Sequence, residues 1–179
     1  RLTNVWTQKA DFGGGGREYA IGFSIGNKGY IGTGNYTNDF WEYDPTTNLW
    51  SQKTSLPALG RAWAVGFAIG NKGYIGMGGS YGGSLWEYDP NYKPILWNRK
   101  PNIPFGASSG FSINGLIFIY YAGAFSNLFW EYNPATETWT QRADFIGPCR
   151  REEVSISIGN KGYIGTGMNM ANPNTYLQD

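Results

Sequence analysis

Three arginines recur at one place in a repeated sequence pattern and are well suited to bind a ligand. Arg17, Arg61 and Arg150 each stand ten residues before the asparagine of a Gly-Asn-Lys-Gly segment. A guanidinium group donates a planar fork of hydrogen bonds to an oxyanion. If the segments share one scaffold, the three groups point to one rim, which suits a carboxylate or an acidic peptide. Alternatively, each arginine bonds backbone carbonyl groups of an adjacent repeat.

Aromatic side chains form a second set of candidates. Tyr36, Tyr81 and Phe125 stand at comparable positions in segments that differ most between repeats. The variable segments are 35–39, 79–83, 124–127 and 168–174. Aromatic rings of this kind stack on a sugar or pack on a peptide. The alternative is that they are loop aromatics that face solvent without a ligand.

Other reactive residue types give little support for catalysis. Glu42, Glu87 and Glu131 recur at one repeat position, whereas acid and base roles need unlike environments. Histidine is absent, and with it the commonest metal ligand and neutral-pH base. The single cysteine, Cys149, is interpreted as a structural thiol. We therefore expect no catalytic residue, no metal and no cofactor.

Composition narrows the classes of partner. The formal net charge of +1 offers no broad electrostatic attraction for nucleic acid. No run of about 18 apolar residues predicts a membrane span. Low charge and many aromatic residues favour an exported bacterial protein, either extracellular or periplasmic.

The repeat itself is clearest around the tryptophans. Trp-Glu-Tyr-Asp-Pro occurs at 41–45 and 86–90, and at 130–134 with Asn in place of Asp. A second series is formed by Trp6, Trp50, Trp97 and Trp139, which leaves only Trp63 outside the scheme. A period in the forties indicates paired helices or four-stranded propeller blades. Short alternating apolar segments between Gly, Asn and Pro favour strands.

Each repeat is predicted to contain four strands, A to D. The predicted strands of the first three repeats cover 18–25, 30–34, 40–43 and 49–53; then 62–69, 74–78, 85–88 and 96–99; then 109–113, 116–120, 128–132 and 138–141. Strands A and B are joined by hairpins at Gly-Asn-Lys-Gly, or at Asn114-Gly115 in the third repeat. Asp-Pro is expected to end strand C, because Pro lacks the N–H that a sheet needs.

With these residues in place, the repeat resembles the kelch motif. The second copy matches best, with Pro57, Arg61, Tyr74, Gly78-Gly79, Tyr88-Asp89-Pro90 and Trp97 in family order. The resemblance implies an all-β protein, a β-propeller of four-stranded antiparallel kelch blades with strand A innermost. It also places the D–A and B–C loops on one face, and gives Trp139 and its equivalents a role in packing blades together.

The whole chain, 1–179, is interpreted as a single propeller domain or propeller segment. Blade one covers 10–53 with an N-terminal strand D at 5–9. Blades two and three cover 54–100 and 101–142, and an incomplete blade four covers 143–179, with only 175–179 available as its strand C. Three arrangements stay open: a segment of a larger ring, a closed four-bladed ring, and a ring completed by a second copy.

The function predicted from these features is a non-catalytic recognition or scaffold module. Its partner is a protein or glycan bound through the loops on one propeller face. The alternative is a propeller enzyme acting on sugars, because similar propellers include galactose oxidase and sialic acid mutarotase. The absence of His argues against a copper oxidase site.

Overall fold

Strands and turns make up the regular structure of the protein. The computed structural model describes residues 4–79, 82–94, 96–103, 105–107, 109–123 and 126–179. Three sheets each contain four antiparallel strands, and shorter sheets follow toward the C-terminus. Among the described residues, no helix is long and apolar enough to cross a membrane. The predicted all-β class is confirmed.

The strands follow chain order within each four-stranded sheet. Blade one contains β1 (Ile21–Ile25), β2 (Lys28–Gly32), β3 (Phe40–Asp44) and β4 (Leu49–Lys53). Blade two contains β5 (Val65–Ile69), β6 (Lys72–Gly76), β7 (Gly83–Tyr88) and β8 (Trp97–Ile103). Blade three contains β9 (Ser109–Ile113), β10 (Leu116–Gly123), β11 (Ser126–Asn133) and β12 (Thr138–Gln141). Blade four is the name used here for β13 (Arg150–Arg151), β14 (Val154–Ile158), β15 (Lys161–Gly165) and β16 (Met168–Asn169).

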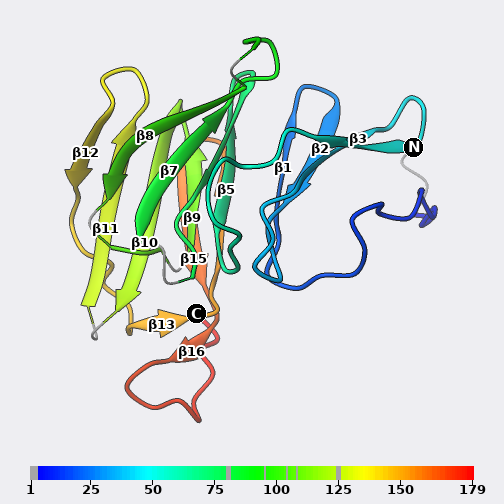
Figure 1. The fold of residues 1–179 in the computed structure, drawn as a ribbon. Helices are drawn as coiled ribbons and strands as arrows, with labels where there is room; N and C mark the ends of the chain where they lie inside the picture. Colours follow the sequence, from blue (N-terminus) through cyan, green and yellow to red (C-terminus); the bar gives the residue numbers. More distant parts are fainter. Residues whose placement is uncertain (1–3, 80–81, 95, 104, 108, 124–125) are drawn as a thin grey trace.

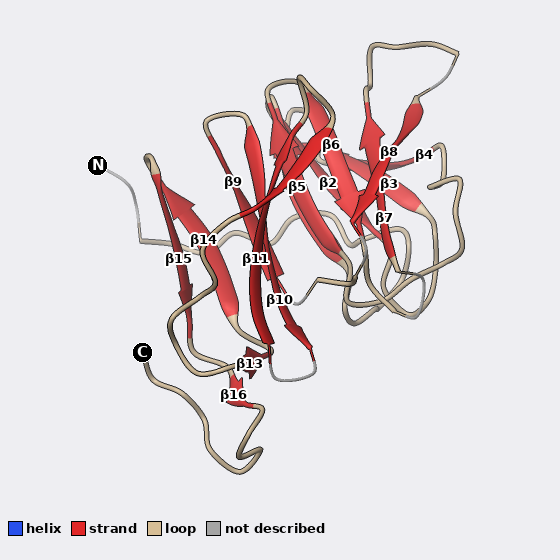
Figure 2. Cartoon of the chain, turned by 90° about the vertical axis from the view of Figure 1, so that its left-hand side faces the viewer, coloured by secondary structure: helices blue, strands red, loops and turns tan. Residues whose placement is uncertain are grey.

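The blades stand side by side and spread outward from their first strands, as Figures 1 and 2 show. Their first strands are neighbours, and a ring on one blade fits a glycine on the next. Phe23 of β1 lies over Gly73 of β6, where an added Cβ would come within 2.5 Å of the ring. Phe111 makes the same contact with Gly162 of β15. In blade three Ile117 stands at the position of Gly73, and Phe67 instead meets Gly110 of the first strand, β9. At each of these boundaries a phenylalanine of one blade therefore fits a glycine of the next.

Tryptophans of the last strand bind the segment that leads into their own blade, and in blades two and three they also pack against the preceding blade. The indole N–H of Trp97 donates to the Thr54 carbonyl at 2.9 Å, and the ring packs edge-on to Phe40 of blade one. Equivalent hydrogen bonds join Trp50 to Ala10 and Trp139 to Pro101. The predicted packing between blades is confirmed for Trp97 and Trp139. Trp50 contacts Ala10 and Phe12, and Trp6 is fully exposed.

The A–B hairpins use two kinds of tight turn. Gly26, Gly70 and Gly159 have φ of 57°, 56° and 60°, which is the sign that type II′ turns require at their first central position. In blade three, Asn114 and Gly115 both have positive φ, as a type I′ turn requires. Each turn has only two residues, so β2 begins at Lys28 and not at the predicted Tyr30.

Two predicted strands at the ends of the chain are wrong. Residues 5–9 form no strand, and the Trp6 side chain is fully exposed. Residues 175–179 contribute one isolated bridge, between Tyr176 and Met168. A strand D needs a strand C as its neighbour, and within the described residues nothing occupies that place in blade four.

A Gly-X-Gly segment after the second strand lets the first strand of the same blade pass close by. Gly34, Gly78 and Gly167 have φ of 83°, 83° and 89°. A Cβ on Gly78 would lie 2.5 Å from the Ala62 carbonyl oxygen and 2.6 Å from the Ala64 nitrogen. Since these are backbone atoms, they cannot swing aside. Glycine is therefore required here for both its conformation and its size.

We expect Gly78→Ala to lower the free energy of unfolding by about 3 kcal/mol, from backbone strain together with overpacking. Urea denaturation followed by tryptophan fluorescence measures the change. Gly16→Ala is the matched control, because no atom lies within 4 Å of the added Cβ and φ is not positive there. Equal stability of the two variants would contradict this explanation of the Gly-X-Gly segment.

Candidate functional site

The three repeated arginines each hold the end of a strand in their own blade. The guanidinium of Arg61 donates to the Met77 carbonyl and to Ser84 Oγ, both at 3.1 Å. Arg17 and Arg150 donate to the carbonyls of Thr33 and Thr166, at 3.0 and 3.1 Å. The acceptor is in every case the residue that follows the second strand of the hairpin.

The structure corrects the expectation that these groups form a ligand-binding rim. Arg61 and Arg150 are 1% and 0% exposed, and the side chain of Arg17 is 8% exposed. Their donors are directed at protein acceptors, because an unpaired guanidinium would be costly to bury. The alternative, that each arginine bonds backbone carbonyl groups, agrees with the structure in the kind of acceptor. The bonded carbonyls belong to the same blade, however, and not to an adjacent one.

Carboxylates complete two of these arginine sites. Arg17 binds both oxygens of Asp39, at 2.7 and 2.8 Å. Asp39 also accepts hydrogen bonds from Thr37 Oγ1 and Trp41 Nε1. Hydrogen bonding from Arg17 is the main cause that lowers the pKa of Asp39 to about 2. Asp179 holds the same relation to Arg150, at 3.1 Å.

An exposed cluster of three aromatic rings lies where the loops of blades one and two meet. Tyr19 and Trp63 have ring centroids 4.3 Å apart and an interplanar angle of 31°. Tyr36 approaches Trp63 edge-on at 5.9 Å. The three side chains are 46%, 47% and 57% exposed, in the order Tyr19, Trp63, Tyr36. We call these three residues the aromatic cluster.

All three residues of the aromatic cluster have a left-handed backbone. Their φ angles are 57° for Tyr19, 56° for Trp63 and 57° for Tyr36. This conformation is strained for a bulky residue, and such strain concentrates at functional sites.

Backbone hydrogen bonds from the adjoining residues fix these loops. Asn35 Oδ1 accepts from the Glu18 amide at 3.1 Å, which joins the two blade-one loops. The Arg61 amide donates to the Thr37 carbonyl at 2.9 Å, which joins blade two to blade one. These bonds fix the backbone path of the loops that carry the three rings.

Sequence reasoning found one member of the aromatic cluster. Tyr36 was a candidate, whereas Tyr81 and Phe125 lie outside the described residues. Tyr19 and Trp63 were missed. The available signal was that both stand two residues after a repeated arginine, and that Trp63 alone falls outside the tryptophan repeat.

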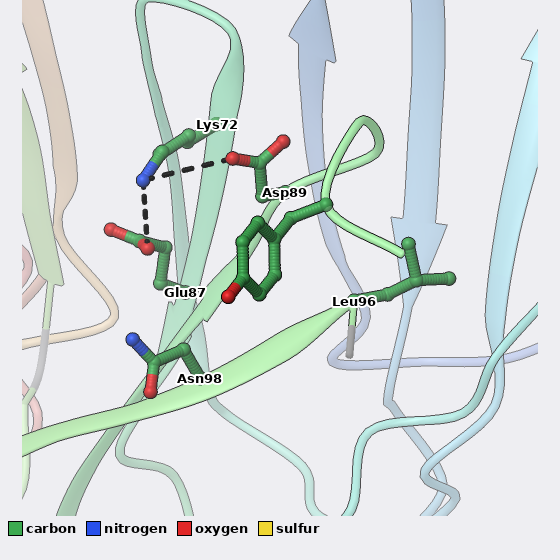
Figure 3. A pocket seen from close by; sticks show the side chains of 6 residues that line it. Lys72, Glu87, Asp89, Leu96 and Asn98 are labelled. Carbon is green, nitrogen blue, oxygen red and sulfur yellow. Dashed lines mark hydrogen bonds and ion pairs between the residues drawn. The ribbon is translucent and has the colours of Figure 1, made fainter. Parts of the chain in front are cut away.

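Two of the three recurrent glutamates, Glu42 and Glu87, join strands at the opposite end of the blades, and the third, Glu131, binds Arg142. Glu87 accepts from Tyr74 Oη at 2.7 Å. It also accepts from Lys72 Nζ at 2.9 Å, beside a pocket of about 300 Å³ (Figure 3). Burial alone would raise the pKa of Glu87, but the hydrogen bonds from Tyr74 and Lys72 outweigh burial and lower it. Glu42 makes the equivalent bonds to Tyr30 and Lys28 in blade one. Because Glu42 and Glu87 have matching environments, they join neighbouring strands and do not provide one general acid and one general base.

The remaining candidate groups have structural surroundings. Cys149 is half-buried, its thiol lies 3.3 Å from the Ser126 carbonyl, and burial raises its pKa. No three His, Cys, Asp or Glu side chains among the described residues gather closely enough to hold a metal ion.

Four-stranded antiparallel sheets arranged as a fan, with their first strands adjacent, define a β-propeller architecture. Residues 29–57, in blade one, match the family model described as Kelch motif. The matched segment contains β2, β3, β4 and the start of the following loop.

Comparison with solved structures agrees with this architecture. The structure of YjhT matches with a TM-score of 0.74 at 17% sequence identity, over 89% of this chain. The chain spans about 60% of the length of YjhT. At this identity the likeness concerns the fold alone. No curated protein matches the chain.

The Arg17–Asp39 contact makes stability depend on pH. Because the folded state lowers the pKa of Asp39, this carboxylate stabilises the fold above pH of about 4 and loses that effect as the pH falls toward about 2. We expect Arg17→Met to raise the pKa of Asp39, measured by carbon-13 NMR titration of the carboxyl group. Arg99→Met, an exposed change elsewhere, is the control. An unchanged Asp39 pKa in Arg17→Met would contradict the assignment.

Proposed function

We propose that the protein is a recognition module that binds carbohydrate through the aromatic cluster of Tyr19, Tyr36 and Trp63. The kelch-type propeller fold supports a binding or scaffold role. The observation that favours a specific site is the exposure of Trp63 together with Tyr19 and Tyr36, which both contact its ring, on loops joined by hydrogen bonds.

The arrangement suits a ligand with flat apolar faces. Tyr19 and Trp63 lie nearly face to face, and Tyr36 stands across the edge of Trp63. Sugar rings present C–H groups that pack on aromatic faces, and their hydroxyl groups require polar neighbours. The exposed Glu18, next to Tyr19, is a neighbour able to accept such hydrogen bonds.

A fixed loop backbone also lowers the entropic cost of binding. Each residue of the cluster is held in a backbone conformation that few bulky residues adopt. Ordering of loops and side chains is one of the principal costs of association. A preformed platform avoids part of that cost, which supports ligand binding over a purely architectural role for these loops.

We expect Trp63→Ala and Tyr36→Ala each to weaken binding to a responsive oligosaccharide by about tenfold, the equivalent of about 1.4 kcal/mol. A panel of immobilised oligosaccharides and acidic peptides identifies the probe, and titration with tryptophan fluorescence measures affinity. Tyr92→Ala is the matched control, since Tyr92 is 64% exposed in the β7–β8 turn, at the other end of the blades.

Binding of a peptide in place of a glycan by the same three residues would change the ligand class. Equal affinity of all variants for every probe would remove the aromatic cluster from the proposal.

A further inference from the structure

A lysine occupies the same position in the last strand of blades one and two. Lys53 of β4 and Lys100 of β8 stand in the same register against the third strand of their blades. Each ammonium group approaches the recurrent glutamate of its own blade. Lys53 Nζ lies 3.1 Å from Glu42 Oε1, and Lys100 Nζ lies 3.5 Å from Glu87 Oε1. The surroundings of the two lysines can therefore be compared directly.

A second carboxylate reaches Lys100 from the next blade. Glu137 lies in the turn between β11 and β12, and its Oε1 is 2.8 Å from Lys100 Nζ. The Lys100 side chain is only 6% exposed, and burial of an ammonium group is costly unless carboxylates pair with it. At the boundary of blades two and three, a turn of the later blade thus supplies a carboxylate to the lysine of the earlier one.

The corresponding turn of blade two supplies no carboxylate to Lys53. This turn starts as in blade three, because the Asn91 amide donates to Asp89 Oδ1 at 2.9 Å and the matching bond in blade three has the same length. Residues 90–96, however, include neither Asp nor Glu. Among the described residues, Glu42 is the one carboxylate in ion-pair contact with Lys53, whose side chain is 30% exposed.

A pocket of about 530 Å³ lies at this position, between blades one and two. Lys28 beside it has a second carboxylate, Asp44, at 3.6 Å, whereas Lys53 has Glu42 alone among the described residues. Asparagines from both blades complete the polar lining, and an amide can donate and accept hydrogen bonds, as a hydroxyl group can. The polar lining includes Lys28, Lys53, Glu42 and the exposed Asn27, Asn71 and Asn91.

We propose that this pocket binds the carboxylate group of a small polyhydroxylated acid, in the place that Glu137 takes at the next boundary. Lys53 holds the carboxylate through a charge-assisted hydrogen bond. The pocket is larger than a carboxylate group alone, and its amides pair with the hydroxyl groups of the same ligand. The site lies at the end of the blades opposite the aromatic cluster and does not depend on it.

D-Glucuronate is the probe for a first experiment, and D-glucose is its neutral counterpart without the carboxylate. Each is titrated into the full chain labelled with nitrogen-15, and NMR follows the side-chain amide signals of Asn27, Asn71 and Asn91. We expect saturable shifts with glucuronate, with a Kd of about 1 mM, and binding of glucose at least about tenfold weaker. Equal affinity for the two sugars, or no saturable shift up to about 50 mM glucuronate, would overturn the proposal.

A lysine substitution tests which group holds the carboxylate. We expect Lys53→Met to weaken glucuronate binding by about tenfold, while Glu42 keeps its hydrogen bonds from Lys28 and Tyr30. Lys161→Met removes the same charge from an exposed residue of blade four and should leave affinity unchanged. Equal affinity of the two variants would contradict the assignment of Lys53.

Asn71→Ala is a second variant, which leaves the ion pairs of Lys53 and Lys28 in place. We expect it to weaken glucuronate binding by about threefold and to leave acetate binding unchanged, because acetate has no hydroxyl group. Urea denaturation confirms that the variants remain folded. Equal affinity of the unmodified chain for acetate and glucuronate would contradict the role of the amides.

Two further readouts separate this site from other occupants. The indole N–H signal of Trp63 reports on the aromatic cluster, and shifts there without shifts at the three asparagines would overturn the proposal. N-acetylaspartate amide carries the carboxylate as a peptide does. Tighter binding of this compound than of glucuronate would assign the pocket to an acidic protein segment and would also overturn the proposal.

Discussion

The hydrogen bond from a buried guanidinium to the carbonyl that follows the second strand holds each arginine-bearing blade in shape. Thr33, Met77 and Thr166, which provide this carbonyl, are themselves left-handed. Their backbone turns sharply only because the next residue is glycine and the arginine fixes the carbonyl. A hydrogen bond from a charged donor contributes about 1.5–3 kcal/mol, which is enough to offset the strain of one such residue. The backbone conformation at this carbonyl therefore sets the direction of the loop that follows it.

The position of the aromatic cluster depends on this hydrogen bond between the arginine and the carbonyl. Tyr19 and Trp63 stand two residues beyond Arg17 and Arg61, and the anchored arginine sets where each ring emerges. Tyr36 leaves the same turn from the other side, three residues after Thr33. The exposed rings and the arginine that fixes the backbone beneath them are thus successive parts of one loop.

Much of the fold could be predicted because the repeat lies in local patterns. Gly-Asn-Lys-Gly defines the hairpins, Asp-Pro ends the third strand, and the period identifies the blades. The site was harder to predict because exposure is a tertiary property. The pattern of Arg17, Arg61 and Arg150 is the same whether a guanidinium faces solvent or its own backbone, and only the path of the Gly-X-Gly segment decides between them. Tyr19 and Trp63 occupy the same position after a repeated arginine in adjacent blades, but the repeat pattern alone does not show that their side chains are exposed and in contact.

The contact between Phe23 and Gly73 also bears on how such chains grow. At each boundary a phenylalanine of one blade meets a glycine of the next, but the glycine lies in the second strand of blades two and four and in the first strand of blade three. A duplicated repeat would therefore fit a new neighbour only if its glycine stood where the ring of that neighbour arrives. The choice of this one residue limits which repeats can exchange places in the chain.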